Sequence, residues 1–137
     1  MRPPKLLVVG SFVMDLIVTA PRFPSAGETV LGSGFSTAPG GKGANQAIQA
    51  ARLGADVTMV GKLGRDDFGR QLRQSAEDAG VDTRYLLHSD AQPSAIGNIQ
   101  VENRNGAAMN RIIVVSGANM DIRPEEVSFF AGNDTRI

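Results

Sequence analysis

The sequence predicts an α/β fold, because strand-like apolar runs alternate with segments of helical periodicity along its 137 residues. The segment from Lys5 to Val9 forms a continuous apolar run, which is typical of a strand buried on both faces of a parallel sheet. Val57 to Val60 forms a second run of this kind. The helical segments Ala44 to Leu53 and Asp66 to Ala79 each follow such a run, so the pattern predicts βα units of an open sheet.

Each predicted helix has a start or stop signal. In the first helix, apolar residues recur at positions 44, 47, 48 and 51, and Gly54 is well placed as the residue that ends it. In the second helix, Asp66 can cap the N-terminus and Gly80 can end the helix. One apolar stripe of the second helix is formed by Phe68, Leu72, Ala76 and Ala79.

Two segments depart from this alternation and are rich in β-prone residues. Between Asp15 and Phe35, the stretches Leu16–Val18 and Thr29–Leu31 are separated by a proline-rich turn. Later, Ile99 and Val101 alternate with polar residues before the turn signal Asn105-Gly106 and the apolar run from Arg111 to Val115. The second segment therefore predicts a hairpin outside the α/β core.

The amino-acid composition excludes several classes of function. Fourteen basic and fourteen acidic residues give no formal net charge, which gives no indication of a nucleic-acid or membrane partner. The absence of cysteine excludes disulfides, thiolate catalysis and cysteine-ligated metals. No apolar stretch is long enough for a signal peptide or a membrane span, so we expect a cytoplasmic protein. His88 is interpreted as a surface residue of a polar turn, and no metal-ligand spacing occurs.

The stretch from Pro39 to Ala47 is the strongest candidate for a ligand site. Gly40, Gly41 and Gly43 allow close approach of the backbone to a ligand, and the helix that follows offers free N–H groups at its N-terminus. Asn45, in the first turn, can both donate and accept hydrogen bonds. This chemistry suits a small polyhydroxy or anionic molecule. The alternative is a glycine-rich turn that only connects a strand to a helix.

Known phosphate-binding loops do not explain the same stretch. A Walker A loop has Ser or Thr after its lysine, whereas Gly43 follows Lys42 here. A dinucleotide-binding fingerprint needs a third glycine where this sequence has Gln46. Asp15 is a further candidate for ligand binding. It follows the first strand, and ligands of open α/β sheets bind at the carboxyl ends of the strands. Its carboxylate either accepts hydrogen bonds from two neighbouring hydroxyls of a ligand or only ends the strand.

Taken in order, these motifs resemble the ribokinase-like (phosphofructokinase-B-type) carbohydrate kinases. The similarity extends to about Val127. The matching motifs are Gly10-Ser11 with Asp15, Gly27-Glu28-Thr29, Gly40 to Ala47, Ala51 to Ala55, Val60 to Gly64, Asp66 to Gly69, Ala79-Gly80-Val81 and Gly117-Ala118-Asn119.

The resemblance implies an open sheet with helices on both faces and one kinase domain over residues 1–137, truncated before its C-terminal half. It also implies that segments at about 12–38 and 95–115 build a small β-sheet lid over the sugar site, through which two subunits often pair. A homodimer is therefore expected. The Gly-Ala-Gly-Asp motif that carries the catalytic base in this family is not in the sequence, so no catalytic residue is assigned here.

The resemblance further implies transfer of the γ-phosphoryl group of ATP to a primary hydroxyl of a sugar, D-ribose giving ribose 5-phosphate. ATP, Mg²⁺ and a monovalent cation such as K⁺ would bind in the missing half. The substrate-binding residues it implies are Val13, Asp15, Gly41, Lys42, Gly43, Ala44 and Asn45. Lys42 has a second interpretation, as a solvated charge of the loop.

Val13 departs from the pattern, because family members that act on ribose typically carry Asn two residues before the aspartate. An apolar side chain cannot replace the hydrogen bonds of that amide. One alternative is therefore a kinase of the same family for another sugar, a sugar acid or a nucleoside. A separate alternative is an inactive dimerising fragment.

Overall fold

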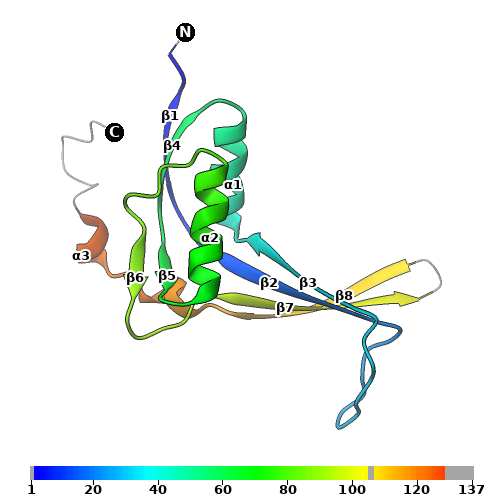
Figure 1. Ribbon diagram of the computed structural model, residues 1–137. Helices are drawn as coiled ribbons and strands as arrows, with labels where there is room; N and C mark the ends of the chain where they lie inside the picture. Colours follow the sequence, from blue (N-terminus) through cyan, green and yellow to red (C-terminus); the bar gives the residue numbers. More distant parts are fainter. Residues whose placement is uncertain (1, 105–106, 129–137) are drawn as a thin grey trace.

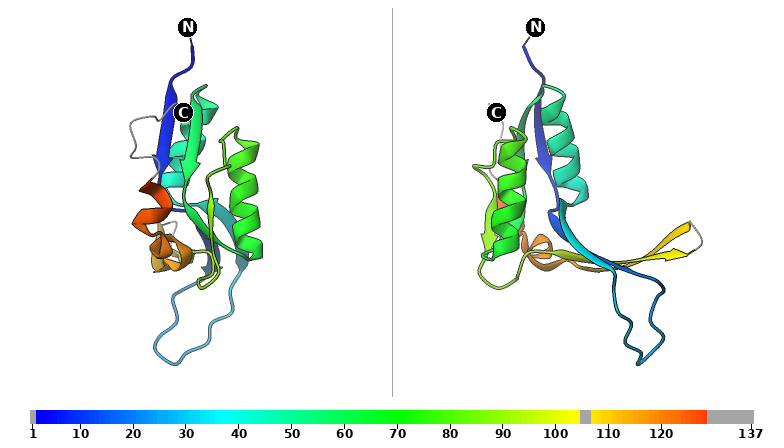
Figure 2. Two further views of the ribbon diagram at one scale, coloured as in Figure 1. Left: turned by 90° about the vertical axis from the view of Figure 1, so that its left-hand side faces the viewer. Right: turned by 45° about the vertical axis from the view of Figure 1, so that its right-hand side comes forward.

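The computed structural model describes residues 2–104 and 107–128 (Figure 1). They form an α/β part and a long four-stranded sheet that extends away from it (Figures 1 and 2). The elements in chain order are β1 (Lys5–Val9), β2 (Val13–Ala20), β3 (Gly34–Gly40), α1 (Lys42–Arg52), β4 (Asp56–Val60), β5 (Lys62–Gly64), α2 (Asp67–Asp78), β6 (Leu87–Ser89), β7 (Ile96–Arg104), β8 (Ala107–Val115), the 3₁₀ helix η1 (Gly117–Asp121) and α3 (Pro124–Val127).

The α/β part contains two parallel strand pairs, β1 with β4 and β5 with β6. Helix α1 packs against β1 and β4, and α2 contacts both α1 and β5. The buried side chains between these elements form the hydrophobic core, which includes Ala47, Val57, Met59, Leu63 and Leu72. The predicted alternation of strands and helices is confirmed in this part of the chain.

The prediction that the first strand is buried on both faces is wrong for the described residues. The side chain of Val9 is 58% exposed, and Leu6 and Leu7 are also exposed. Strand β1 pairs with β4 on one side, and within residues 2–104 and 107–128 no strand pairs with its other edge. An apolar run identifies a strand here, but its burial depends on neighbours that the run does not specify.

Both helices begin and end close to the predicted positions. Helix α1 begins at Lys42. Gly54, whose φ is 93°, follows the C-cap residue Leu53. The predicted cap of α2 is confirmed, because Asp66 Oδ1 accepts a hydrogen bond from the Gly69 N–H at 2.8 Å. His88 was predicted in a turn, but it lies in β6, which pairs with β5.

The four-stranded sheet has the order β3-β2-β7-β8. Strands β7 and β8 form the predicted antiparallel hairpin, whose predicted turn at Asn105-Gly106 lies outside the described residues. The β-prone stretch Thr29–Leu31 forms no strand, since the antiparallel partner of β2 is β3, which begins at Gly34. Residues 21–33 form a loop instead, stabilised by a bidentate ion pair between Arg22 and Glu28, and Thr29–Leu31 have no neighbouring strand.

Strand β2 connects the two parts of the molecule. Its second residue, Met14, is completely buried in the hydrophobic core, and the strand then runs outward into the sheet (Figure 2). Successive side chains of a strand point to opposite faces, so Val13 and Asp15 lie on the face opposite to Met14. No helix in the described ranges is long and apolar enough to cross a membrane.

Candidate functional site

The glycine-rich stretch forms the junction of β3 and α1. Gly41 is the N-cap residue of α1, with φ 105°, a conformation that residues with a Cβ rarely adopt. Helix α1 has no side-chain cap. Its first intrahelical bond runs from the Asn45 N–H to the Gly41 carbonyl at 2.8 Å, while the Ala44 N–H donates to the Ser11 carbonyl at 3.1 Å. The start of α1 is therefore attached to the connection between β1 and β2.

The glycines of this junction pack against the protein's own backbone. A Cβ placed on Gly43 would lie 2.7 Å from the Cα of Gly10, and one placed on Gly41 would lie 2.5 Å from the Ser11 carbonyl oxygen. No side chain fits at either distance. Close packing of two chain segments is therefore sufficient to explain these two glycines, whereas the sequence prediction attributed them to the approach of a ligand.

Asp15 lies beside this junction, on β2 between the strands β3 and β7. A Cβ on Gly40 would stand 2.9 Å from Asp15 Oδ2, and a Cβ on Gly97 would stand 2.6 Å from Oδ1. Gly97 is the residue of β7 directly opposite Asp15. Glycines on both flanking strands thus leave the space that the carboxylate occupies.

The carboxylate of Asp15 has no hydrogen-bond or ion-pair partner among the residues that the structure describes. Burial raises the pKa of this carboxyl above its ordinary value of 3.8. An ionised carboxylate without partners in a half-buried position costs stability, because it loses part of its hydration. A ligand that donates hydrogen bonds to the carboxylate would replace the hydration that the carboxylate loses on burial.

The other predicted site residues differ in how they are placed. The side chain of Val13 lies on the same face as Asp15, with its Cγ1 3.7 Å from the Cβ position of Gly97. Lys42 and Asn45 are exposed in the first turn of α1. Ala44 has its side chain in the core, and its N–H is already used by Ser11, so neither group is available to a ligand.

Sequence reasoning missed the role of two glycines and one amide. Gly97 provides the space for Asp15, but its position opposite Asp15 follows from the register of β2 and β7, which no local motif specifies. Asn119 contacts the backbone of Phe12, 107 residues away in sequence. Gly40 was recognised only as part of the loop, although its contact with Asp15 links the loop to the carboxylate.

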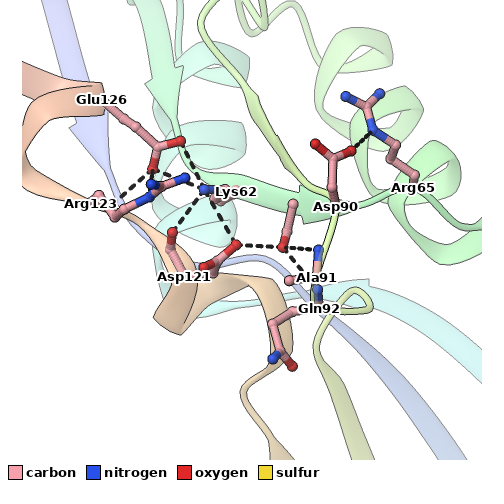
Figure 3. Close-up of polar contacts among 9 residues, drawn as sticks. Lys62, Arg65, Asp90, Ala91, Gln92, Asp121, Arg123 and Glu126 are labelled. Atoms are coloured by element: carbon pink, nitrogen blue, oxygen red, sulfur yellow. Dashed lines mark hydrogen bonds and ion pairs between the residues drawn. The ribbon is translucent and has the colours of Figure 1, made fainter.

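A buried lysine was also missed. Figure 3 shows Lys62 of β5 directed toward η1 and α3, where its Nζ donates to the Asp121 carbonyl at 2.8 Å and to both Glu126 carboxylate oxygens at 2.9 Å. The lysine is 2% exposed. A charge buried this deeply needs such partners, so the cluster joins η1 and α3 to the α/β part.

Comparison with known proteins identifies the class to which this fold and this site belong. The model of the pfkB family carbohydrate kinases matches residues 3–134, and the chain belongs to that family. Its α/β fold is ribokinase-like and covers about two fifths of the solved structures that it matches.

Three relatives show how far the similarity extends. The chain is 48% identical over 119 residues to the ribokinase of Bacillus subtilis, covering 87% of this chain and 39% of that protein. It is 35% identical over 122 residues to the deoxyribokinase of Salmonella typhi, covering 89% and 39%. The structure of Arabidopsis thaliana ribokinase complexed with ribose and ATP matches with a TM-score of 0.76 and 36% identity, covering 87% and 38%.

Proposed function

We propose that this chain is the sugar-binding part of an ATP-dependent sugar kinase whose substrate is D-ribose, phosphorylated to ribose 5-phosphate. The observation that carries the proposal is the Asp15 carboxylate, which lies without a protein partner between Gly40 and Gly97 among the described residues. Membership of the carbohydrate kinase family and the similarity to ribokinases support the assignment. The complex of the similar Arabidopsis ribokinase with ribose supports the choice of sugar.

In this proposal, Asp15 accepts hydrogen bonds from two neighbouring hydroxyls of the sugar and fixes its orientation. The exposed amide of Asn45 and the N-terminal end of α1 supply donors from the other side of the junction, with Lys42 at the rim. Gly41 and Gly43 contribute by holding the junction close to Ser11. These residues bind and orient the sugar, and none of them transfers a proton.

The four-stranded sheet acts in the proposal as a lid built from segments at about 12–38 and 95–115. It excludes water from the sugar when it closes. All nine residues of its edge strand β8 are exposed, and the apolar run Ile112 to Val115 is among them. An exposed apolar edge strand favours pairing with another chain, so we propose a homodimer formed through this sheet. A cytoplasmic location remains a prediction from composition.

The phosphoryl donor in the proposal is ATP, assisted by Mg²⁺ and a monovalent cation such as K⁺. The described residues contain no group of three or more His, Asp or Glu side chains that could hold a metal ion. In the proposal, none of the sugar-binding residues named above holds ATP or either cation.

The side chain of Val13 favours a second candidate substrate, which is also a sugar. Its apolar side chain lies beside Gly97 on the face of Asp15, where a hydroxyl of ribose would find no hydrogen-bond partner. A deoxy sugar has no hydroxyl at one position and would lose nothing there. The similarity to a deoxyribokinase is consistent with 2-deoxy-D-ribose as the alternative.

Calorimetric titration of the complete protein that contains this chain tests the proposal. D-ribose and 2-deoxy-D-ribose would be titrated into the wild type, Asp15→Asn and Val13→Asn. Loss of charge-assisted hydrogen bonds of about 1.5–3 kcal/mol predicts that Asp15→Asn binds sugar at least tenfold more weakly. Asp90→Asn is the matched control, because its carboxylate is 83% exposed and pairs with Arg65 at the surface.

The two variants separate the possible outcomes. Tighter ribose binding by Val13→Asn would identify ribose as the substrate whose hydroxyl lacks a partner in the wild type. Preference of the wild type for 2-deoxy-D-ribose would favour the alternative. Sugar affinity that Asp15→Asn leaves unchanged would remove Asp15 from the site and contradict the proposal.

A further inference from the structure

The backbone of Phe12 has an unusual hydrogen-bond partner. Phe12 lies between β1 and β2, and the amide of Asn119 bonds both of its main-chain groups. The Phe12 N–H donates to Asn119 Oδ1 at 3.1 Å, and Asn119 Nδ2 donates to the Phe12 carbonyl at 2.8 Å. A side-chain amide that bonds both groups of one residue replaces the two bonds that a neighbouring strand would make.

Asn119 can hold Phe12 in place because η1 is itself anchored to the α/β part. The Ala118 N–H donates to the Pro93 carbonyl at 2.8 Å, and the Ala118 side chain is completely buried. At the other end of η1, Asp121 accepts hydrogen bonds from Lys62 and from the hydroxyl of Ser89 (Figure 3). These contacts hold η1 in place, and with it the side-chain amide of Asn119.

The segment that Asn119 holds connects both halves of the candidate sugar site. Ser11, one residue before Phe12, accepts the hydrogen bond of Ala44 at the start of α1. Asp15, three residues after Phe12, carries the carboxylate that has no partner among the described residues. The Phe12 side chain is 1% exposed in the core, so its position is set by packing, whereas the orientation of its peptide groups is set by Asn119.

We infer that Asn119 is a positioning residue for sugar binding: it fixes the Ser11–Asp15 segment so that the Asp15 carboxylate and the N-terminal end of α1 face the same ligand. This inference rests on the proposed function. It explains why an amide is needed at position 119, since both a donor and an acceptor are used. Small rotations of a peptide group displace the side chains that follow it, and site geometry tolerates little displacement.

Steady-state kinetics of the complete protein that contains this chain tests the inference, with Asn119→Ala and Asn119→Asp. The aspartate is nearly isosteric and keeps an acceptor for the Phe12 N–H, but it places an oxygen against the Phe12 carbonyl. We expect the KM for D-ribose to rise at least fivefold in both variants and the KM for ATP to stay within twofold. The aspartate variant decides the case if the alanine variant does not fold.

Thr83→Val is the control for a loss of stability alone. Thr83 is buried, and its hydroxyl donates a hydrogen bond to the Glu77 carboxylate in the α/β part. This variant should lower Tm and leave the KM for ribose unchanged. An unchanged KM for ribose in folded Asn119→Asp, or equal changes in the KM values for ribose and ATP, would overturn the inference but leave the proposed function standing. Absence of ribose binding in the wild type would instead overturn the proposed function and the inference with it.

Discussion

The α/β part and the four-stranded sheet are built from similar apolar residues but use them differently. In the α/β part, Leu72 of α2 is 1% exposed and packs with Met59 and Leu63 in one core. In the sheet, Ile113 of β8 is 67% exposed, and the other residues of β8 are exposed as well. The same residue types therefore stabilise one part and leave a surface available in the other.

Two aspartates show the same contrast in polar groups. Asp66 at the start of α2 accepts hydrogen bonds from the Gly69 and Ser94 N–H groups, at 2.8 and 2.7 Å. Burial acts to raise its pKa, but these two bonds, together with the Ser94 hydroxyl and the charge of Arg70, outweigh burial and the pKa is lowered. Asp15 in the sheet has no such bonds among the described residues, and its pKa is raised by burial. Asp66 therefore has the hydrogen bonds expected of a residue that stabilises the fold, whereas Asp15 lacks such bonds among the described residues, as our proposal for sugar binding requires.

The largest expected effect comes from truncating one aliphatic side chain in each region. Leu72→Ala should lower the free energy of unfolding by about 2–5 kcal/mol, because it leaves a cavity in the core. Ile113→Ala should change it by less than about 0.5 kcal/mol in a single chain with β8 exposed, and by more in the proposed homodimer, where a second chain would cover β8. Urea denaturation of the complete protein, followed by circular dichroism, measures both. A large loss for Ile113→Ala would show that another chain covers β8.

A smaller effect is expected for Asp66→Ala, which removes the cap of α2 and leaves the Ser94 N–H without its partner. The expected loss is about 2 kcal/mol at neutral pH. Because the pKa of Asp66 is lowered when folded, its contribution is present above the ordinary value of 3.8 and is lost as pH falls through the folded value. The Tm difference between wild type and variant should therefore shrink below about pH 4. A constant difference would contradict this role.

Local signals predicted the helices well. Periodicity, the cap at Asp66 and the terminal Gly54 are properties of a few neighbouring residues, and the structure confirms each of them. The hairpin of β7 and β8 was predicted for the same reason, since alternation and turn residues act locally. Motifs that keep their order along the chain predicted Asp15 and the start of α1 as site residues, and that prediction is carried into the proposed function.

Features that depend on distant segments were not predictable. The exposure of β1 and the loop at Thr29–Leu31 are set by which strands become neighbours. The packing of Gly41 and Gly43 against Gly10 and Ser11 was not predicted, because the sequence does not show that these two segments come together. Asn119 matched a family motif, but its contact with Phe12 spans 107 positions and leaves no local pattern.

Thermal unfolding of wild type and Asp15→Asn, each with and without saturating D-ribose, tests the central claim most directly. Since the folded pKa of Asp15 is raised, the ionised carboxylate costs stability at neutral pH, where it is deprotonated. We predict that Asp15→Asn has a Tm equal to or above that of the wild type without ribose, and that ribose raises Tm only in the wild type. A lower Tm of the variant without ribose, together with an undiminished shift by ribose, would show that Asp15 serves the fold and not the sugar.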